Sequence, residues 1–118
     1  MRAVSIDPFR HPEQHYRIDN FTVPADAREA FEAAMRRNVA FLETLPGFLG
    51  HVAFVTTGGP GAFDVATIAA WESAAALERA VAAVRAHYAE IGFDMRTALE
   101  QWGAAAQCGN FRAPAELQ

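Results

Sequence analysis

The chain contains no lysine, because all ten of its basic residues are arginine. This absence excludes mechanisms that need a Schiff-base lysine, such as pyridoxal phosphate chemistry and lysine aldolases. Cys108 is the only cysteine. An intrachain disulfide, an iron–sulfur site and a cysteine-rich zinc site are therefore excluded as well.

Basic clusters and long apolar runs are also missing. The net charge is −4 and no basic stripe is visible, so we expect no nucleic-acid partner. No apolar run reaches the roughly 18 residues needed to cross a bilayer, so we expect no membrane partner. Residues 1–16 lack the apolar core of a signal peptide, and we expect a cytoplasmic protein. With 52% apolar and 20% charged residues, the 118-residue chain has the composition of one globular domain.

No motif for a metal or a cofactor is present. The four histidines are scattered, and none is spaced from another histidine or a carboxylate as metal ligands are. The glycine-rich segment 58–61 joins two expected strands, whereas a phosphate-binding loop is followed directly by a helix. We therefore expect no metal and no cofactor. If the protein performs redox chemistry, the substrate itself must supply the electrons.

The segment 63–71 is apolar on both faces of an expected strand. Alternate side chains of a strand project to opposite faces, so Val65, Thr67 and Trp71 share one face and Ile68 lies on the other. Both faces need cover, and a chain of this length has helices for only one of them. We therefore expect a second copy of the chain to cover the other face, as a homodimer.

The hydrophobic periodicity predicts an α+β fold. Its order is that of a ferredoxin-like βαββαβ domain with a short extra helix before the last strand. Right-handed crossovers then place both long helices on one side of a four-stranded sheet. The domain is expected over residues 16–112, after an irregular N-terminal arm (1–15) and before a C-terminal tail (113–118). The expected strands cover 16–23, 48–57, 62–71 and 103–112, and the expected helices begin after 26, 73 and 94.

Three residues are expected to cap the helices. Asp26 stands three residues before Glu29, which is the spacing of a capping box. Ser73 and Asp94 precede the second and third helices, and Gly92 is expected to end the second.

Five pieces of the sequence, in this order and at this spacing, carry a family resemblance: Phe21-Thr22-Val23-Pro24, Asn38, Leu45-Pro46-Gly47-Phe48, Val65-Ala66-Thr67-Ile68-Ala69-Ala70-Trp71-Glu72 and the segment 88–93. Together, over about residues 16–112, they resemble the antibiotic biosynthesis monooxygenase family of dimeric α+β barrels. The resemblance implies a dimer with one pocket per subunit, between the sheet and its helices. Some members of that family oxidise polycyclic phenols or anthrones to quinones with O2 and without metal or flavin, and some relatives bind and degrade haem.

Three residues are candidates for catalysis. Trp71, which matches a family tryptophan, either lines the pocket and donates its indole N–H to a flat aromatic ligand or is a large core residue. Asn38 is the polar exception on an apolar helix stripe, and it contacts a ligand, contacts the backbone at the sheet edge or lies in water at the border of the stripe. His87 near the end of the second long helix is either a proton acceptor or a helix-end residue beside the last carbonyls.

Three further residues are candidates for substrate binding. Tyr88 continues the apolar stripe of the second long helix and is either a ligand contact or a core residue. His51 enters the pocket only if its face of the second strand meets the helices, and otherwise lies at the dimer interface. Asp19 shares a half-buried strand face with Phe21, as a pocket carboxylate or as the partner of an arginine at the rim.

Three functions remain open at this stage. The first is a cofactor-independent monooxygenase for a small aromatic ligand, and the second is a small-molecule-binding protein without turnover. The third is a haem-degrading relative. It is less favoured, because this chain differs from those members at two of the residues that they use. They use a histidine about ten residues after the tryptophan and an asparagine on the first strand, where this chain has Val81 and Asp19.

Overall fold

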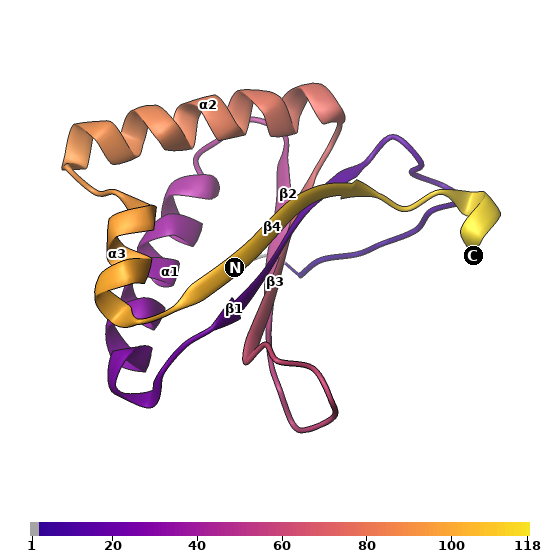
Figure 1. Cartoon of the computed structure of the whole chain (residues 1–118). Coiled ribbons are helices and arrows are strands. Elements are labelled where there is room, and N and C mark those ends of the chain that lie inside the picture. The colour runs from indigo at the N-terminus through magenta and orange to yellow at the C-terminus, as the bar shows by residue number, and fades with distance from the viewer. Residues whose placement is uncertain (1–2) are drawn as a thin grey trace.

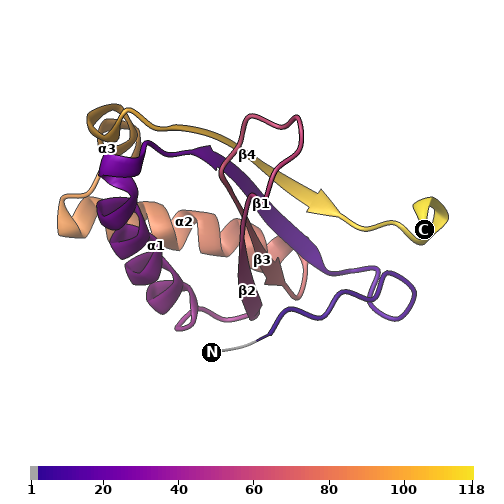
Figure 2. The ribbon, with the colours of Figure 1, turned by 90° about the horizontal axis from the view of Figure 1, so that it is seen from below.

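The computed structural model describes residues 3–118 and confirms the ferredoxin-like α+β fold (Figure 1). Three helices lie on one side of a single four-stranded sheet (Figures 1 and 2). The elements are β1 (His15–Thr22), the 3-10 turn η1 (Ala25–Ala27), α1 (Arg28–Leu42), β2 (Phe48–Val55), β3 (Val65–Trp71), α2 (Ala74–Ile91), α3 (Met95–Trp102), β4 (Ala105–Arg112) and the 3-10 turn η2 (Ala115–Leu117).

The sheet has the strand order β2-β3-β1-β4, and all neighbouring strands are antiparallel. This order follows from the two crossovers that α1 and α2 make. The register aligns Asp19 of β1 with Thr67 of β3 on one side and with Cys108 of β4 on the other. Side chains in such a row project to the same face of a sheet, so polar groups from three strands meet on the helical side.

The core is divided into two clusters. One joins the end of β3 to α2 through Phe48, Trp71 and Leu77. The other joins the start of β3 to α1 through Phe21, Phe31 and Val65. The expected division of β3 is confirmed, because Val65, Thr67 and Trp71 are buried on the helical side while Ile68 on the other face is only half-buried.

The face of the sheet without helices carries large apolar side chains. Phe54 on β2 and Phe111 on β4 are each 50% exposed in the single chain. The N-terminal arm and the C-terminal tail lie on this side (Figure 1). Residues 3–14 form no helix or strand, whereas His15 already belongs to β1. The expected dimer, which would cover this face, stays a prediction.

Two of the three predicted helix caps are confirmed. The Ser73 side chain accepts a hydrogen bond from the Ala76 N–H at 3.1 Å, and the Asp94 carboxylate accepts one from the Thr97 N–H at 3.2 Å. The Asp26 capping box is wrong. Asp26 lies inside η1, where the Ala27 N–H already donates to the Pro24 carbonyl at 3.0 Å, and the helix begins from Ala27 without a side-chain cap.

Gly47 is required by the turn that follows α1. Its φ is +82°, and a Cβ built on it would stand 2.6 Å from the Cβ of Ala76 at the start of α2. Its carbonyl also accepts a hydrogen bond from the Glu72 N–H at 2.9 Å, which ties the turn to the end of β3. The turn therefore fixes how closely α2 approaches the sheet.

We predict that Gly47→Ala lowers the free energy of unfolding by about 2–4 kcal/mol, from the left-handed conformation and from the overlap with Ala76 together. Gly92→Ala is the matched control. Its φ of +69° carries the same conformational cost, but no atom lies within 4 Å of the added Cβ. Urea denaturation measures both variants, and equal losses would show that the close approach to Ala76 contributes nothing.

Candidate functional site

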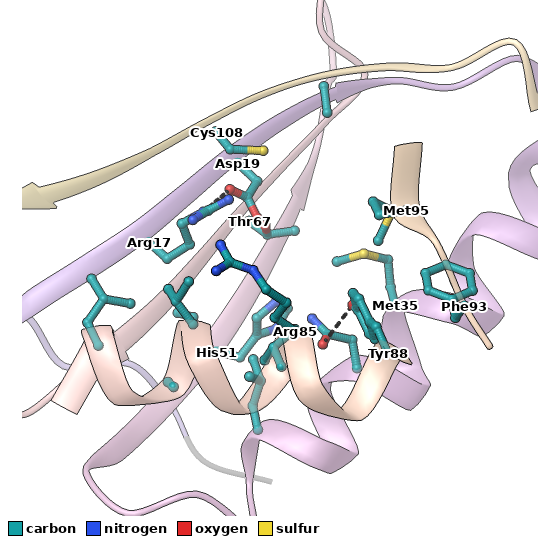
Figure 3. A pocket seen from close by; sticks show the side chains of 18 of the residues that line it. Arg17, Asp19, Met35, His51, Thr67, Arg85, Tyr88, Phe93, Met95 and Cys108 are labelled. Atoms are coloured by element: carbon teal, nitrogen blue, oxygen red, sulfur yellow. Dashed lines mark hydrogen bonds and ion pairs between the residues drawn. The ribbon is translucent and has the colours of Figure 1, made fainter. Parts of the chain in front are cut away.

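A cavity of about 570 Å³ lies between the helices and the inner face of the sheet. It separates the two core clusters, and all four strands and all three helices contribute to its wall. Figure 3 shows the polar side of the wall on the strands, facing α2. The strands supply Arg17, Asp19, Phe21, His51, Thr67, Ala69, Trp71, Ala106 and Cys108, and most of the remaining wall is apolar side chains of the helices.

The polar wall is organised by an ion pair within β1. Arg17 Nε donates to Asp19 Oδ1 at 2.7 Å (Figure 3), and Arg17 Nη1 reaches Asn110 Oδ1 on β4 at 3.5 Å. Asp19 thus lies in the cavity wall, as one expectation had it, and its arginine partner lies there too. Since residues two apart on a strand share a face, the Arg17-x-Asp19 spacing itself was the signal for this pair.

Cys108 lies beside this ion pair and lines the cavity (Figure 3). Burial raises the pKa of the Cys108 thiol, and the negative charge of Asp19 raises it further. The thiol is therefore protonated at neutral pH, which makes it a weak nucleophile. Cys108 contributes surface to the site and no evident reactivity.

His51 projects into the cavity, so its face of β2 meets the helices. Burial lowers the pKa of His51, and the nearby negative charge of Asp19 offsets part of this effect. The imidazole is therefore neutral at pH 7 and can accept a proton from a bound molecule. Within residues 3–118 no side chain or carbonyl forms a hydrogen bond that fixes its ring.

Trp71 lines the cavity from the end of β3 and is only 1% exposed. Its ring packs edge-on against Phe48, with ring centroids 5.2 Å apart. The indole Nε1 is buried and finds no acceptor in the part of the chain that the structure describes. Leaving a buried donor unpaired costs about 1–3 kcal/mol, so a ligand oxygen that displaces the atoms now covering this N–H would gain a hydrogen bond.

Tyr88 and Asn38 join α2 to α1 at another part of the wall. The Tyr88 hydroxyl donates to Asn38 Oδ1 at 3.0 Å, and both residues line the cavity. Burial raises the pKa of Tyr88, and the charge of Asp19 adds to the rise, so the phenol stays protonated and the hydrogen bond persists at neutral pH. With its oxygen occupied, the Asn38 amide has its NH2 group available as a donor.

His87 does not line this cavity. Its ring stacks on Phe41 of α1, with centroids 4.0 Å apart and planes 5° apart. It borders a much smaller cleft of about 20 Å³, on the other side of Asn38 and Tyr88. The structure thus brings together five of the six residues selected from the sequence and separates His87 from them.

Arg85 is a cavity residue that the sequence reasoning missed. It follows Val81 by one helical turn and so belongs to the stripe of α2 that faces the sheet. Its guanidinium extends from α2 towards the Arg17–Asp19 pair (Figure 3), and it forms no ion pair within residues 3–118.

The described residues offer no ready site for a metal ion, since no group of three or more histidine, cysteine or carboxylate side chains among them is arranged to hold one. None of the described helices is both long enough and apolar enough to cross a membrane.

Solved structures resemble the chain over most of its length. SnoaB from Streptomyces nogalater, a cofactor-independent oxygenase, is 26% identical with a TM-score of 0.63, over 86% of this chain and 93% of SnoaB. MhuD from Mycobacterium tuberculosis, a heme-degrader with two hemes bound in its active site, is 25% identical with a TM-score of 0.57, over 84% and 94%. A conserved Methanosarcina mazei Go1 protein shares the fold, with a TM-score of 0.68 at 12% identity, over 88% and 96%.

No curated protein sequence matches the chain. The family model described as "Antibiotic biosynthesis monooxygenase" matches residues 15–90, which is more than half of the 118 residues. The match includes β1, α1, β2, β3 and nearly all of α2, and therefore most of the cavity wall. The chain belongs to the antibiotic biosynthesis monooxygenase family.

Proposed function

We propose that the protein is a cofactor-independent monooxygenase that oxidises an aromatic, anthrone- or quinol-like small molecule with O2. The observation that carries the proposal is a largely apolar cavity lined by Trp71, whose buried indole N–H has no acceptor among the described residues. A flat aromatic molecule with a carbonyl or phenol oxygen supplies both the apolar surface and the missing acceptor. The likeness to SnoaB, a cofactor-independent oxygenase, supports the same reaction class.

The reaction balances without an external reductant. For an anthrone, an activated ring CH2 group and O2 give a ring C=O group and water, and the two C–H bonds supply the electrons that reduce the second oxygen atom. For a quinol, one ring C–H becomes C–OH while the two O–H groups become C=O groups, and their hydrogens leave with the second oxygen atom as water. The reactive species is the substrate anion, which transfers an electron to O2 readily. The protein therefore has to take one proton, stabilise the negative oxygen that results and exclude bulk water.

Each of these tasks has a candidate side chain. Trp71 Nε1 donates to the substrate oxygen on which the negative charge develops. His51 accepts the proton, because it lines the cavity and its lowered pKa keeps it neutral. The Asn38 amide, oriented by Tyr88, supplies a second donor for the substrate. A base role for His87 has less support, because its ring is stacked on Phe41 outside the cavity.

A second candidate function is binding without turnover. It is favoured by one observation, that no hydrogen bond among residues 3–118 orients the His51 ring as a general base usually requires. A haem-degrading function fits the residues less well, despite the likeness to MhuD. The cavity wall contributed by α2 contains Val81, and the imidazole of that helix, His87, lies outside the wall.

We also propose that the functional unit is a homodimer formed by the open faces of two sheets. Phe54 and Phe111 would then be covered, which removes an exposed apolar patch of the kind monomeric proteins avoid. The cavity would remain on the helical side of each subunit, so that each chain holds its own site.

The first of three predictions for the proposed function concerns Trp71. Trp71→Phe keeps an aromatic ring and removes only the N–H, and we expect kcat/KM for O2 uptake with an anthrone or 1,4-dihydroxynaphthalene to fall roughly 10- to 100-fold, as for loss of a buried donor to a charged oxygen. Trp102→Phe is the matched control, since Trp102 packs on Phe31 and does not line the cavity. Equal rates in the two variants, or turnover only after haem or flavin is added, would contradict the proposal.

The second prediction concerns pH. Because burial lowers the pKa of His51 below its usual value of 6.5, the neutral base persists as the pH falls to 6.5, and the acidic decline of kcat/KM should have its midpoint below pH 6.5. His51→Gln should abolish this decline along with most activity, while His87→Gln should retain both. A decline that disappears in His87→Gln instead would move the base to His87.

The third prediction concerns assembly. Phe54→Glu places a charge on the open face and should convert a dimer to a monomer in light scattering after gel filtration. Ile91→Glu is the control, because Ile91 is similarly exposed, at 53%, but lies at the end of α2 on the helical side. A wild-type protein that is monomeric at micromolar concentration would remove the basis for the proposed dimer.

A further inference from the structure

The charges of the cavity wall leave one arginine without a partner. Four charged side chains line the cavity, namely Arg17, Asp19, Arg85 and Asp94. Asp19 is engaged by Arg17 at 2.7 Å. Asp94 accepts a hydrogen bond from the Thr97 N–H at 3.2 Å and so caps α3. Its neighbours in the chain, Phe93 and Met95, lie away from the Arg17–Asp19 pair in Figure 3. Arg85 therefore remains as an unmatched positive charge.

The Arg85 guanidinium extends into the cavity, where a ligand can reach its charge. Arg85 is anchored on α2, on the stripe of that helix that faces the sheet. Its guanidinium extends towards the Arg17–Asp19 pair of β1, with Thr67 nearby in the view of Figure 3. It does not reach Asp19, since no ion pair within 4.0 Å joins the two among the described residues. Arg85 is exposed in the single chain, and its planar guanidinium, which has no ion-pair partner among the described residues, is free to bind a carboxylate through two parallel N–H donors.

We propose that Arg85 selects aromatic ligands that carry a carboxylate. Arg85 would pair with that carboxylate inside the cavity, on the α2 side that faces the Arg17–Asp19 ion pair. This inference rests on the proposed function, because it assumes that an aromatic molecule occupies the cavity. The inference adds to the proposed function that the ligand carries a negative charge and that Arg85 is the residue that recognises this charge. The apolar wall of α2 between Trp71 and Arg85, formed by Leu77, Val81 and Val84, receives the ring, so that a second oxygen of the ligand lies towards Trp71.

The test compares two ligands that differ only in charge, 6-hydroxy-2-naphthoate and its methyl ester. Both are stable aromatic phenols, so binding is measured by titration calorimetry at pH 7 without turnover. The wild-type protein should bind the acid at least tenfold more tightly than the ester. Arg85→Gln should weaken binding of the acid about tenfold and leave binding of the ester unchanged.

Arg79→Gln is the matched control. Arg79 is an exposed arginine on the same helix that does not line the cavity, so the variant removes the same charge from the same element. It should behave as the wild type does. An unchanged thermal midpoint in Arg85→Gln is expected, because the guanidinium forms no ion pair within residues 3–118 that would be lost.

Three results would overturn the inference: equal affinity of the wild type for acid and ester, a preference for the acid that survives in Arg85→Gln, or the same loss in Arg79→Gln. In each of these cases an aromatic ligand still binds, so the proposed function stands. If neither ligand binds the wild-type protein, the result counts against the proposed function and against this inference together.

Discussion

The burial of the Trp71 indole is the constraint on which the rest of the structure depends. Trp71 is the last residue of β3, and Ser73, two residues later, caps α2. The ring therefore lies at the junction between the sheet and the longest of the described helices. Phe48 packs edge-on against it, and Gly47 lets the start of α2 approach closely. The same ring forms part of the cavity wall, with its N–H unpaired. A residue that packs the fold together at this point is therefore also the one that we propose as the most specific contact to a ligand.

The cavity exists because α2 meets the sheet mainly near one end. Near Trp71 the helix presents Ala76 and Ala80, whose small side chains allow close packing. The second cluster, around Phe31, is built by α1, with Trp102 of α3 packed against it, and lies at the other end of β3. Between the two clusters, the sheet carries a row of polar groups that no helix covers closely. A division of the core costs stability, since apolar contacts are forgone, and this is a common feature of binding sites.

Patterns of hydrophobicity were sufficient to predict the order of the elements and the two apolar faces of β3, but not which of these faces meets the helices. These features follow from alternation and helical periodicity, which act within one element. The Asp26 cap failed because a 3-10 turn after Pro24 competes for the same residues. The sequence left open which face His51 occupies and whether Asp19 lies in the cavity or at its rim, and Arg85 was overlooked. Whether a long polar side chain points to solvent or across a cavity depends on the opposite wall, which no single element encodes.

The most direct measurement of the central claim is a nitrogen–proton correlation spectrum of the indole groups during titration with 6-hydroxy-2-naphthoate. The chain has two tryptophans, so two indole signals are expected, and Trp71→Phe assigns them. The account predicts that the Trp71 proton moves downfield as its N–H gains a hydrogen bond to the ligand, while the Trp102 signal stays in place. Saturation of binding with both signals unchanged would contradict the claim that the Trp71 N–H holds an oxygen of the ligand.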